Sequence, residues 1–209
     1  MCMKQILCFG DSNTYGLIPG TKERYPWEVR WTGILGEKVK EKGFRVIEEG
    51  LCGRTTVFED ELRDNRRGVA ALPMLLETHQ PLEKVILMLG TNDCKTIYQA
   101  SAEIIGKGIE KLIHQIQAVD KNMKILLVSP ILLAEGVGEA GFDPEFGQES
   151  VETSKRLKEV YQKIAERNGC EFLAASDYAK ASEVDREHLD ESGHSLLAEA
   201  IFSKISNVF

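Results

Sequence analysis

Short apolar runs alternate with longer amphipathic segments along most of this chain. Five apolar runs are predicted to be β-strands, and they cover residues 5–9, 45–48, 84–89, 124–129 and 171–174. Runs 84–89 and 124–129 are almost continuously apolar, which is typical of parallel strands buried on both faces. Because helical segments separate the runs, we expect a three-layer α/β/α fold, with a five-stranded parallel, flavodoxin-like sheet and helices on both faces.

Apolar residues at helical spacing predict the helices. The predicted helices cover residues 32–42, 68–78, 101–119, 150–167 and 191–205. Gly169 follows the fourth helix at the position of a C-cap, and Asp190 precedes the last helix at the position of an N-cap. Pro73 is expected to split the second helix, since proline removes a backbone hydrogen bond there.

Two longer segments, 17–29 and 131–147, show neither the alternation of a strand nor the spacing of a helix. Both are rich in glycine and proline. Both follow predicted strands on the side where residue 12 emerges. Long loops in compact domains are often binding loops, although plain surface connections remain an alternative. Nothing divides the chain, so residues 1–209 are expected to form a single domain.

Composition excludes several classes of protein. The net charge is −7, which argues against nucleic acid or an anionic membrane as the partner. No apolar run approaches the roughly 20 residues that span a bilayer, and the first residues do not resemble a signal peptide. The cysteines are odd in number and scattered, which argues against a disulfide framework and against a metal site. This pattern favours a reducing, cytoplasmic compartment. The cysteines are Cys2, Cys8, Cys52, Cys94 and Cys170. We expect no cofactor.

Polar segments follow the first three predicted strands. Gly10-Asp11-Ser12-Asn13 follows the first, Gly53 lies just after the second, and Gly90-Thr91-Asn92-Asp93 follows the third. The carboxyl ends of parallel strands meet at one sheet edge, where ligands bind. A serine on such a turn is a candidate nucleophile, although each segment alone is also ordinary turn chemistry.

Four histidines compete for the role of general base. His114 lies within a helix, His79 lies at a helix end, and His194 falls in the first turn of the last helix, where a structural hydrogen bond is the expected role. His188 lies in the loop before that helix, with Asp185 three residues earlier. One irregular turn can bring this carboxylate to the imidazole Nδ1, so we predict His188 as the base, with an acid limb near pH 6.5.

These segments, in this order and at these separations, resemble the SGNH (GDSL-type) hydrolase superfamily. The four blocks of that family match Ser12, Gly53, Asn92 and the Asp185-x-x-His188 pair. The chain is most similar to the branch of small oligomeric arylesterases, acyltransferases and acetyl-xylan esterases. The segments that carry this closer similarity are 10–16, 29–33, 48–56 and 87–93. Asn13 stands where the superfamily name calls for leucine.

The resemblance implies a serine esterase that hydrolyses, or transfers, short acyl groups of small-molecule esters through an acyl-enzyme. Ser12 would be the nucleophile, His188 the base and Asp185 the residue that orients it. The oxyanion would be met by the backbone N–H groups of Ser12 and Gly53 and by the side chain of Asn92.

Candidate substrate-binding residues lie beside these positions: Asp11, Tyr15, Trp27 and Phe142. The resemblance, together with the bulk of Tyr15, Trp27, Trp31 and Phe142 in or near the site loops, implies a short acyl group such as acetyl. The resemblance also implies a homo-oligomer, with octamers known in the branch, and the segment from Trp27 to Trp31 offers an aromatic surface for such an interface.

Two alternatives remain open on sequence. One is a carbohydrate deacetylase of the same superfamily, acting on acetylated xylo-oligosaccharides. The other is a flavodoxin-like ligand-binding module, which binds a flavin phosphate at the same sheet edge. Such a module has no use for the Asp185-x-x-His188 pair.

Overall fold

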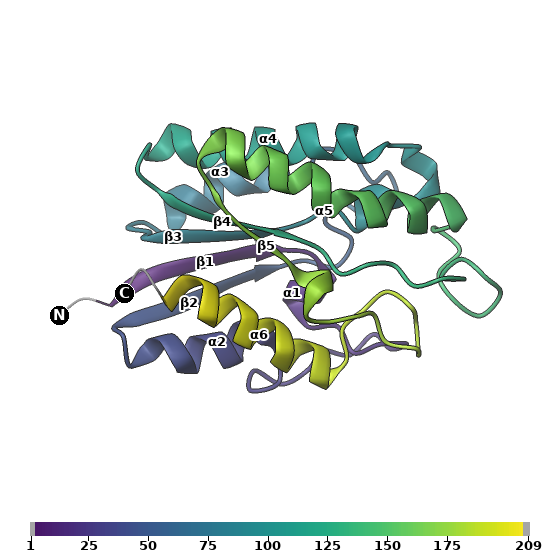
Figure 1. The fold of residues 1–209 in the computed structure, drawn as a ribbon, viewed down its shortest axis with the longest axis horizontal. Helices are drawn as coiled ribbons and strands as arrows, with labels where there is room; N and C mark the ends of the chain where they lie inside the picture. The colour runs from purple at the N-terminus through teal and green to yellow at the C-terminus, as the bar shows by residue number, and fades with distance from the viewer. Residues whose placement is uncertain (1–2, 207–209) are drawn as a thin grey trace.

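The structure is a computed structural model that describes residues 3–206. Five parallel strands form one sheet in the order β2-β1-β3-β4-β5 (Figure 1). The strands are β1 (Lys4–Gly10), β2 (Phe44–Gly50), β3 (Lys84–Met88), β4 (Lys124–Ser129) and β5 (Glu171–Ala174). This arrangement confirms the predicted fold class, and every strand lies where the apolar runs predicted it.

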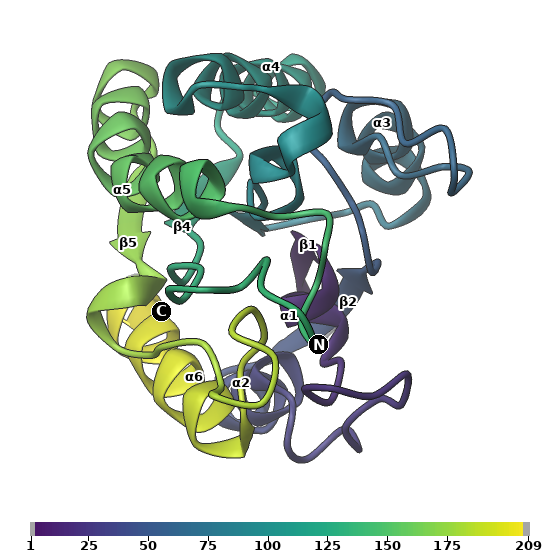
Figure 2. The ribbon, with the colours of Figure 1, turned by 90° about the vertical axis from the view of Figure 1, so that its right-hand side faces the viewer.

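Helices cover both faces of the sheet. One face carries α3 (Gly68–Thr78), α4 (Ala102–Val119) and α5 (Gln148–Asn168), and the other carries α2 (Trp31–Lys40) and α6 (Glu191–Ile205) (Figure 2). Shorter turns follow three strand ends: α1 (Ser12–Tyr15), η1 (Asn92–Cys94) with η2 (Thr96–Tyr98), and η3 (Ala175–Asp177). As expected, Asp190 caps α6 by accepting the Gly193 N–H at 2.7 Å.

The register of the central strands aligns their carboxyl ends. Gly10 of β1 lies opposite Gly50 of β2 and opposite Met88 of β3. The polar segments that follow these strands therefore leave the sheet at one level. An added Cβ at Gly50 would lie 2.1 Å from the Tyr15 backbone nitrogen, so glycine is required where β2 passes under α1.

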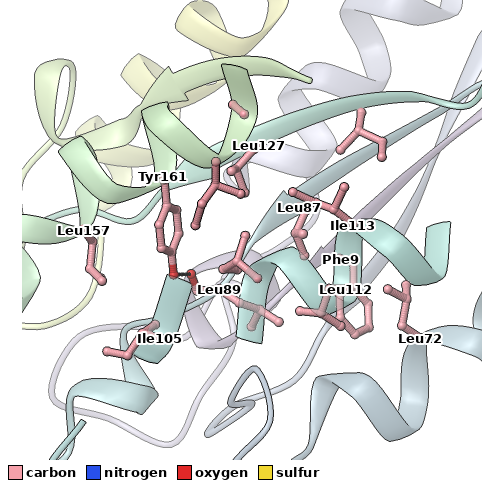
Figure 3. Close-up of a cluster of buried hydrophobic side chains, with 14 of the residues drawn as sticks. Phe9, Leu72, Leu87, Leu89, Ile105, Leu112, Ile113, Leu127, Leu157 and Tyr161 are labelled. Carbon is pink, nitrogen blue, oxygen red and sulfur yellow. Dashed lines mark hydrogen bonds between the residues drawn. The ribbon is translucent and has the colours of Figure 1, made fainter. Parts of the chain in front are cut away.

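Two apolar cores lie on opposite faces of the sheet. The larger core packs α3, α4 and α5 against the strands and includes Phe9, Leu87 and Tyr161 (Figure 3). Fully burying one such side chain contributes about 1.5–3 kcal/mol. The Tyr161 hydroxyl is not left unpaired, because it donates to the Leu89 carbonyl at 2.9 Å. The core thus holds α5 against the end of β3, directly before the Asn92 turn.

Pro73 does not split α3, and that prediction is wrong. The helix is continuous from Gly68 to Thr78 with Pro73 inside it. Proline leaves the carbonyl four residues earlier, that of Val69, without its helical partner. The Gln115 side chain of α4 donates to this carbonyl at 2.9 Å. A tertiary hydrogen bond therefore replaces the one that proline removes.

Trp31 is not a surface residue, which corrects the expectation that it contributes to an interface. Its side chain is fully buried at the start of α2, and its indole nitrogen donates to the Asn13 carbonyl at 3.1 Å. Trp27 is the exposed member of the pair, with 36% of its surface accessible.

Within residues 3–206, no helix combines the length and apolar character needed to cross a membrane. Four cysteines are free: Cys8, Cys52, Cys94 and Cys170. Cys2 lies outside the described residues.

Candidate active site

Ser12 begins the single-turn helix α1 immediately after β1. The Asp11 side chain caps this turn by accepting the Asn13 N–H at 3.0 Å. Ser12 itself is only 3% exposed. The strand and the cap together fix its backbone, so its hydroxyl points from a rigid position at the carboxyl edge of the sheet.

His188 and Asp185 meet Ser12 in a continuous chain of contacts. His188 Nε2 lies 2.8 Å from Ser12 Oγ, and His188 Nδ1 lies 2.8 Å from Asp185 Oδ2. Asp185 Oδ1 also accepts the backbone N–H of His188 at 3.0 Å. Its Oδ2 accepts the N–H of Gly20 at 3.0 Å, which ties the 17–29 loop to this carboxylate. The structure therefore brings the three predicted residues together in the predicted order.

The charges around His188 favour its protonated form. Burial alone would lower its pKa, but the carboxylates of Glu187 and Asp185, with a further contribution from Asp11, raise the pKa to about 9. Burial likewise opposes ionisation of Asp185, yet its bonds to His188 outweigh this and lower its pKa to about 2. Asp185 thus stays ionised and stabilises the imidazolium.

The other histidines have other partners. His194 is fully buried, and its Nδ1 accepts the Trp31 backbone N–H at 3.3 Å. Burial lowers its pKa to about 4. His79 bonds Glu49 and His114 bonds Asn168. Of the four, only His188 reaches Ser12.

Three candidate oxyanion donors come from the segments that follow β1, β2 and β3. Among the described residues, the backbone N–H groups of Ser12 and Gly53 make no hydrogen bond. Gly53 adopts a φ of 80°, a conformation that favours glycine. The Asn92 side chain uses one N–H for the Arg54 carbonyl, at 3.1 Å, and retains a second. These groups can receive a developing negative charge.

Asp93 and Arg54 hold the donor loops in place, a role that their positions in the sequence do not predict. The fully buried Asp93 accepts the Thr56 backbone N–H at 2.9 Å and the Thr56 hydroxyl. Burial raises the pKa of Asp93 to about 7. Arg54 donates to the Gly10 carbonyl at 2.8 Å. Both residues lie inside the predicted polar segments, but only tertiary contacts reveal what they bind.

Asn13 links the serine turn to the histidine loop. Its Oδ1 accepts the Leu189 N–H at 2.9 Å, and its Nδ2 donates to the Glu187 carbonyl at 3.4 Å. In the sequence, Asn13 stands out only as a departure from the family name. Its place next to Ser12 was the only signal for this role.

The predicted substrate-binding residues lie at different depths. Asp11 is buried beneath the serine turn, and burial raises its pKa to about 6. Tyr15 stacks under the Arg24 guanidinium, 4.0 Å from the ring centroid. Arg30 lies 5.2 Å from the centroid of Trp27. Phe142 packs beneath the guanidinium of Arg186, two residues before the histidine, at 3.9 Å. Phe142 thus contacts the histidine loop, and Asp11 lies near enough to act on the pKa of His188.

No group of three or more His, Cys, Asp or Glu side chains that could hold a metal ion occurs between residues 3 and 206. The contacts described above instead join a hydroxyl, an imidazole and a carboxylate, the arrangement that activates a serine for acyl transfer.

Comparison with known proteins gives the same picture. The model of the GDSL-like lipase/acylhydrolase family matches residues 8–196. Est24, a carbohydrate acetylesterase from Sinorhizobium meliloti, is 36% identical, with a TM-score of 0.91 over 99% of this chain and 100% of that one. The inhibitor-bound M. smegmatis aryl esterase is 33% identical, with a TM-score of 0.90 over 99% and 100%.

A lipase/acylhydrolase from Enterococcus faecalis shares the fold at 19% identity, with a TM-score of 0.71 over 98% of this chain and 96% of that one. No curated protein sequence matches the chain. The family match spans most of the chain and includes the serine, histidine and aspartate described above. The chain therefore belongs to the GDSL-like lipase/acylhydrolase family, within the SGNH hydrolases, and is a carboxylic ester hydrolase.

Proposed function

We propose that this protein hydrolyses short acyl esters, such as acetyl esters of small alcohols, phenols or sugars, with Ser12 as the nucleophile. The observation that carries the proposal is the Asp185–His188–Ser12 chain, in which both contacts measure 2.8 Å. It supports the assignment because a serine hydroxyl is a weak nucleophile until an oriented base takes its proton.

In the proposed reaction, His188 Nε2 removes the Ser12 proton as Oγ attacks the ester carbonyl. Asp185 holds the imidazole with Nδ1–H toward itself and stabilises the imidazolium that forms. The imidazolium then gives the proton to the leaving alcohol. Water, or a second alcohol, resolves the acyl-enzyme by the reverse sequence, so acyl transfer is open to the same residues.

The oxyanion is assigned to the N–H groups of Ser12 and Gly53 and to the side chain of Asn92. Support comes from the two unpaired backbone N–H groups and from the spare amide hydrogen of Asn92. Losing one such donor typically costs about 10²–10³ in rate.

Short-chain preference follows from the bulk near the site and from the kind of relatives found. Phe142 packs against Arg186 of the histidine loop, and Tyr15 ends the turn that Ser12 begins. The two similar enzymes are named for acetyl and aryl esters. Activity on acetylated xylo-oligosaccharides is the second candidate, which the similarity to Est24 favours.

We further propose that the protein is a cytoplasmic homo-oligomer, up to an octamer in size. Each subunit would form a single domain over residues 1–209. Four free cysteines support the reducing compartment. The exposed Trp27 with Arg30 beside it supports an interface, because aromatic residues and arginine are enriched at interface cores.

The central test is Ser12→Ala together with a serine-directed phosphonate. The variant should keep the fold and lose nearly all hydrolysis of p-nitrophenyl acetate, and the phosphonate should label Ser12 in the unmodified protein. An active Ser12→Ala protein, or labelling of another residue, contradicts the proposal.

A further inference from the structure

Glu187 places a buried carboxyl group beside the Ser12–His188 pair. It is only 6% exposed, and its Oε1 lies 3.6 Å from His188 Nε2, the nitrogen that contacts Ser12 Oγ. In the proposed reaction this nitrogen returns the proton to the leaving alcohol. The alcohol half of the substrate must therefore lie next to Glu187.

The backbone of Glu187 is fixed on both sides. Its N–H donates to Asp185 Oδ1 at 3.1 Å, and its carbonyl accepts from Asn13. Its carboxyl group, however, receives no hydrogen bond from any group between residues 3 and 206. Its ion-pair partner is His188 Nε2, 3.6 Å away, so a ligand hydroxyl would supply a hydrogen bond that the protein does not provide here.

The charged neighbours of Glu187 come from three segments. Burial is the main cause that raises its pKa to about 7; His188 and Lys95 act to lower it, and Asp143 and Asp185 act to raise it. Lys95 is already paired with Glu145, at 2.7 Å. Near neutral pH the Glu187 carboxyl group can thus accept a hydrogen bond or, when protonated, donate one. A hydroxyl group, which also does both, matches it better than a fixed cation does.

We propose that Glu187 binds a hydroxyl group of the leaving alcohol, on the carbon adjacent to the one that carries the ester, and so selects esters of polyols and sugars. The proposal rests on the function proposed above and names its substrate class. During proton return, the leaving oxygen lies within hydrogen-bond reach of His188 Nε2, about 2.6–3.2 Å. A carboxyl oxygen 3.6 Å from that nitrogen is then in position for the neighbouring hydroxyl of a vicinal diol. Glu187 forms no covalent bond in this role.

Two substrates that differ in one hydrogen-bond donor test the proposal. The ester 2-hydroxyethyl acetate carries the adjacent hydroxyl, and 2-methoxyethyl acetate has it blocked. We expect the unmodified protein to favour the first by about tenfold or more in kcat/KM, the size of one hydrogen bond to a charged group. This ratio should collapse toward unity in Glu187→Ala and in Glu187→Leu, which fills more of the buried volume. Glu187→Gln, which keeps an acceptor, should retain part of it.

The matched control is Glu183→Gln, which removes an exposed carboxylate from the same loop. It should leave the ratio unchanged. If Glu187→Leu keeps the full ratio and only shifts the pH profile, the carboxyl group acts through the charge of His188 alone and the proposal is overturned. A protein that neither hydrolyses p-nitrophenyl acetate nor reacts with the phosphonate at Ser12 instead contradicts the proposed function.

Discussion

Asn13 Oδ1 accepts a hydrogen bond from the backbone N–H of Leu189, 2.9 Å away and 176 residues further along the chain. The residue after the proposed nucleophile therefore positions the residue after the proposed base. No sequence pattern predicts this contact, because it depends on how α1 packs against the loop before α6 at the sheet edge.

Asn13→Ala should lower kcat on p-nitrophenyl acetate by about tenfold to a hundredfold, because a misplacement near 1 Å can cost that much. It should also reduce the free energy of unfolding by about 1–3 kcal/mol, since the buried Leu189 N–H loses its acceptor. Steady-state kinetics and urea unfolding measure the two effects. Asn122→Ala, at an exposed turn, is the control that should change neither. Full activity in Asn13→Ala would show that the histidine loop holds its position unaided.

Replacing the two candidate bases should separate their roles. His188→Ala should reduce kcat/KM by orders of magnitude, since only this imidazole contacts Ser12 Oγ. His194→Ala should act mainly on stability, because that side chain is buried against the Trp31 backbone. Activity per folded molecule, corrected by circular dichroism, distinguishes the two outcomes. A greater loss of activity in folded His194→Ala would move the base to His194.

The acid limb of the pH–rate profile should lie above the unperturbed value near 6.5 that the sequence alone suggested. Catalysis requires the free imidazole, and the pKa of His188 is raised to about 9 against the effect of burial by its carboxylate neighbours. Activity should therefore rise through neutral pH into the alkaline range. Glu187→Gln removes one of those charges and should move the limb to lower pH. A limb near 6.5 in the unmodified protein, unmoved by this substitution, would contradict the assignment.

The contribution of His194 to stability should be lost as the solution is acidified below about pH 6.5. Burial lowers the pKa of His194 to about 4, whereas the unfolded chain binds the proton near 6.5. At this residue the unfolded state takes up more protons between these values, which disfavours the folded state by on the order of 3 kcal/mol at the lower end of the window. The raised pKa values of Asp11, Asp93 and Glu187 act in the opposite direction, so the effect is measured as a difference between the unmodified protein and His194→Asn. In urea unfolding from about pH 4 to pH 7.5, the two proteins should differ in the pH dependence of stability, and equal dependences would contradict the assignment to His194.

Trp27→Glu should dissociate the proposed oligomer, because Trp27 is the exposed aromatic residue of its segment. Light scattering behind a sizing column should give a multiple of 23.4 kDa for the unmodified protein and a smaller mass for the variant. Trp31→Glu is expected to unfold the chain instead, since it buries a charge in the core. A mass near one chain for the unmodified protein rules the oligomer out.

The architecture followed from the sequence because parallel strands and amphipathic helices leave strong periodic signals. All five strands lie where the apolar runs placed them, and Asp190 caps α6 as its position suggested. The expected positions of Ser12, Asp185 and His188 required only that strand ends converge and that one short turn fold back.

What sequence could not supply were contacts that depend on packing. Pro73 stays inside a helix because Gln115 reaches the carbonyl it frees. Trp31 is buried because it packs in the core cluster that α2 and α6 form with the sheet. The sequence shows Glu187 only as a carboxylate in a loop. Its position 3.6 Å from His188 Nε2 depends on how that loop folds. These contacts join side chains from segments far apart in the sequence, and the periodicity of one segment does not predict which residue of another it will contact.

The Asn13–Leu189 contact and the Ser12–His188 contact join the first strand to the loop before the last helix. Nearly the whole chain must therefore be synthesised and folded before Ser12 and His188 come into contact. Nascent chains and truncated products that stop short of residue 188 keep the Ser12 hydroxyl but lack the imidazole that contacts it. With Ser12 and His188 in their proposed roles, the appearance of esterase activity therefore reports that the fold is complete.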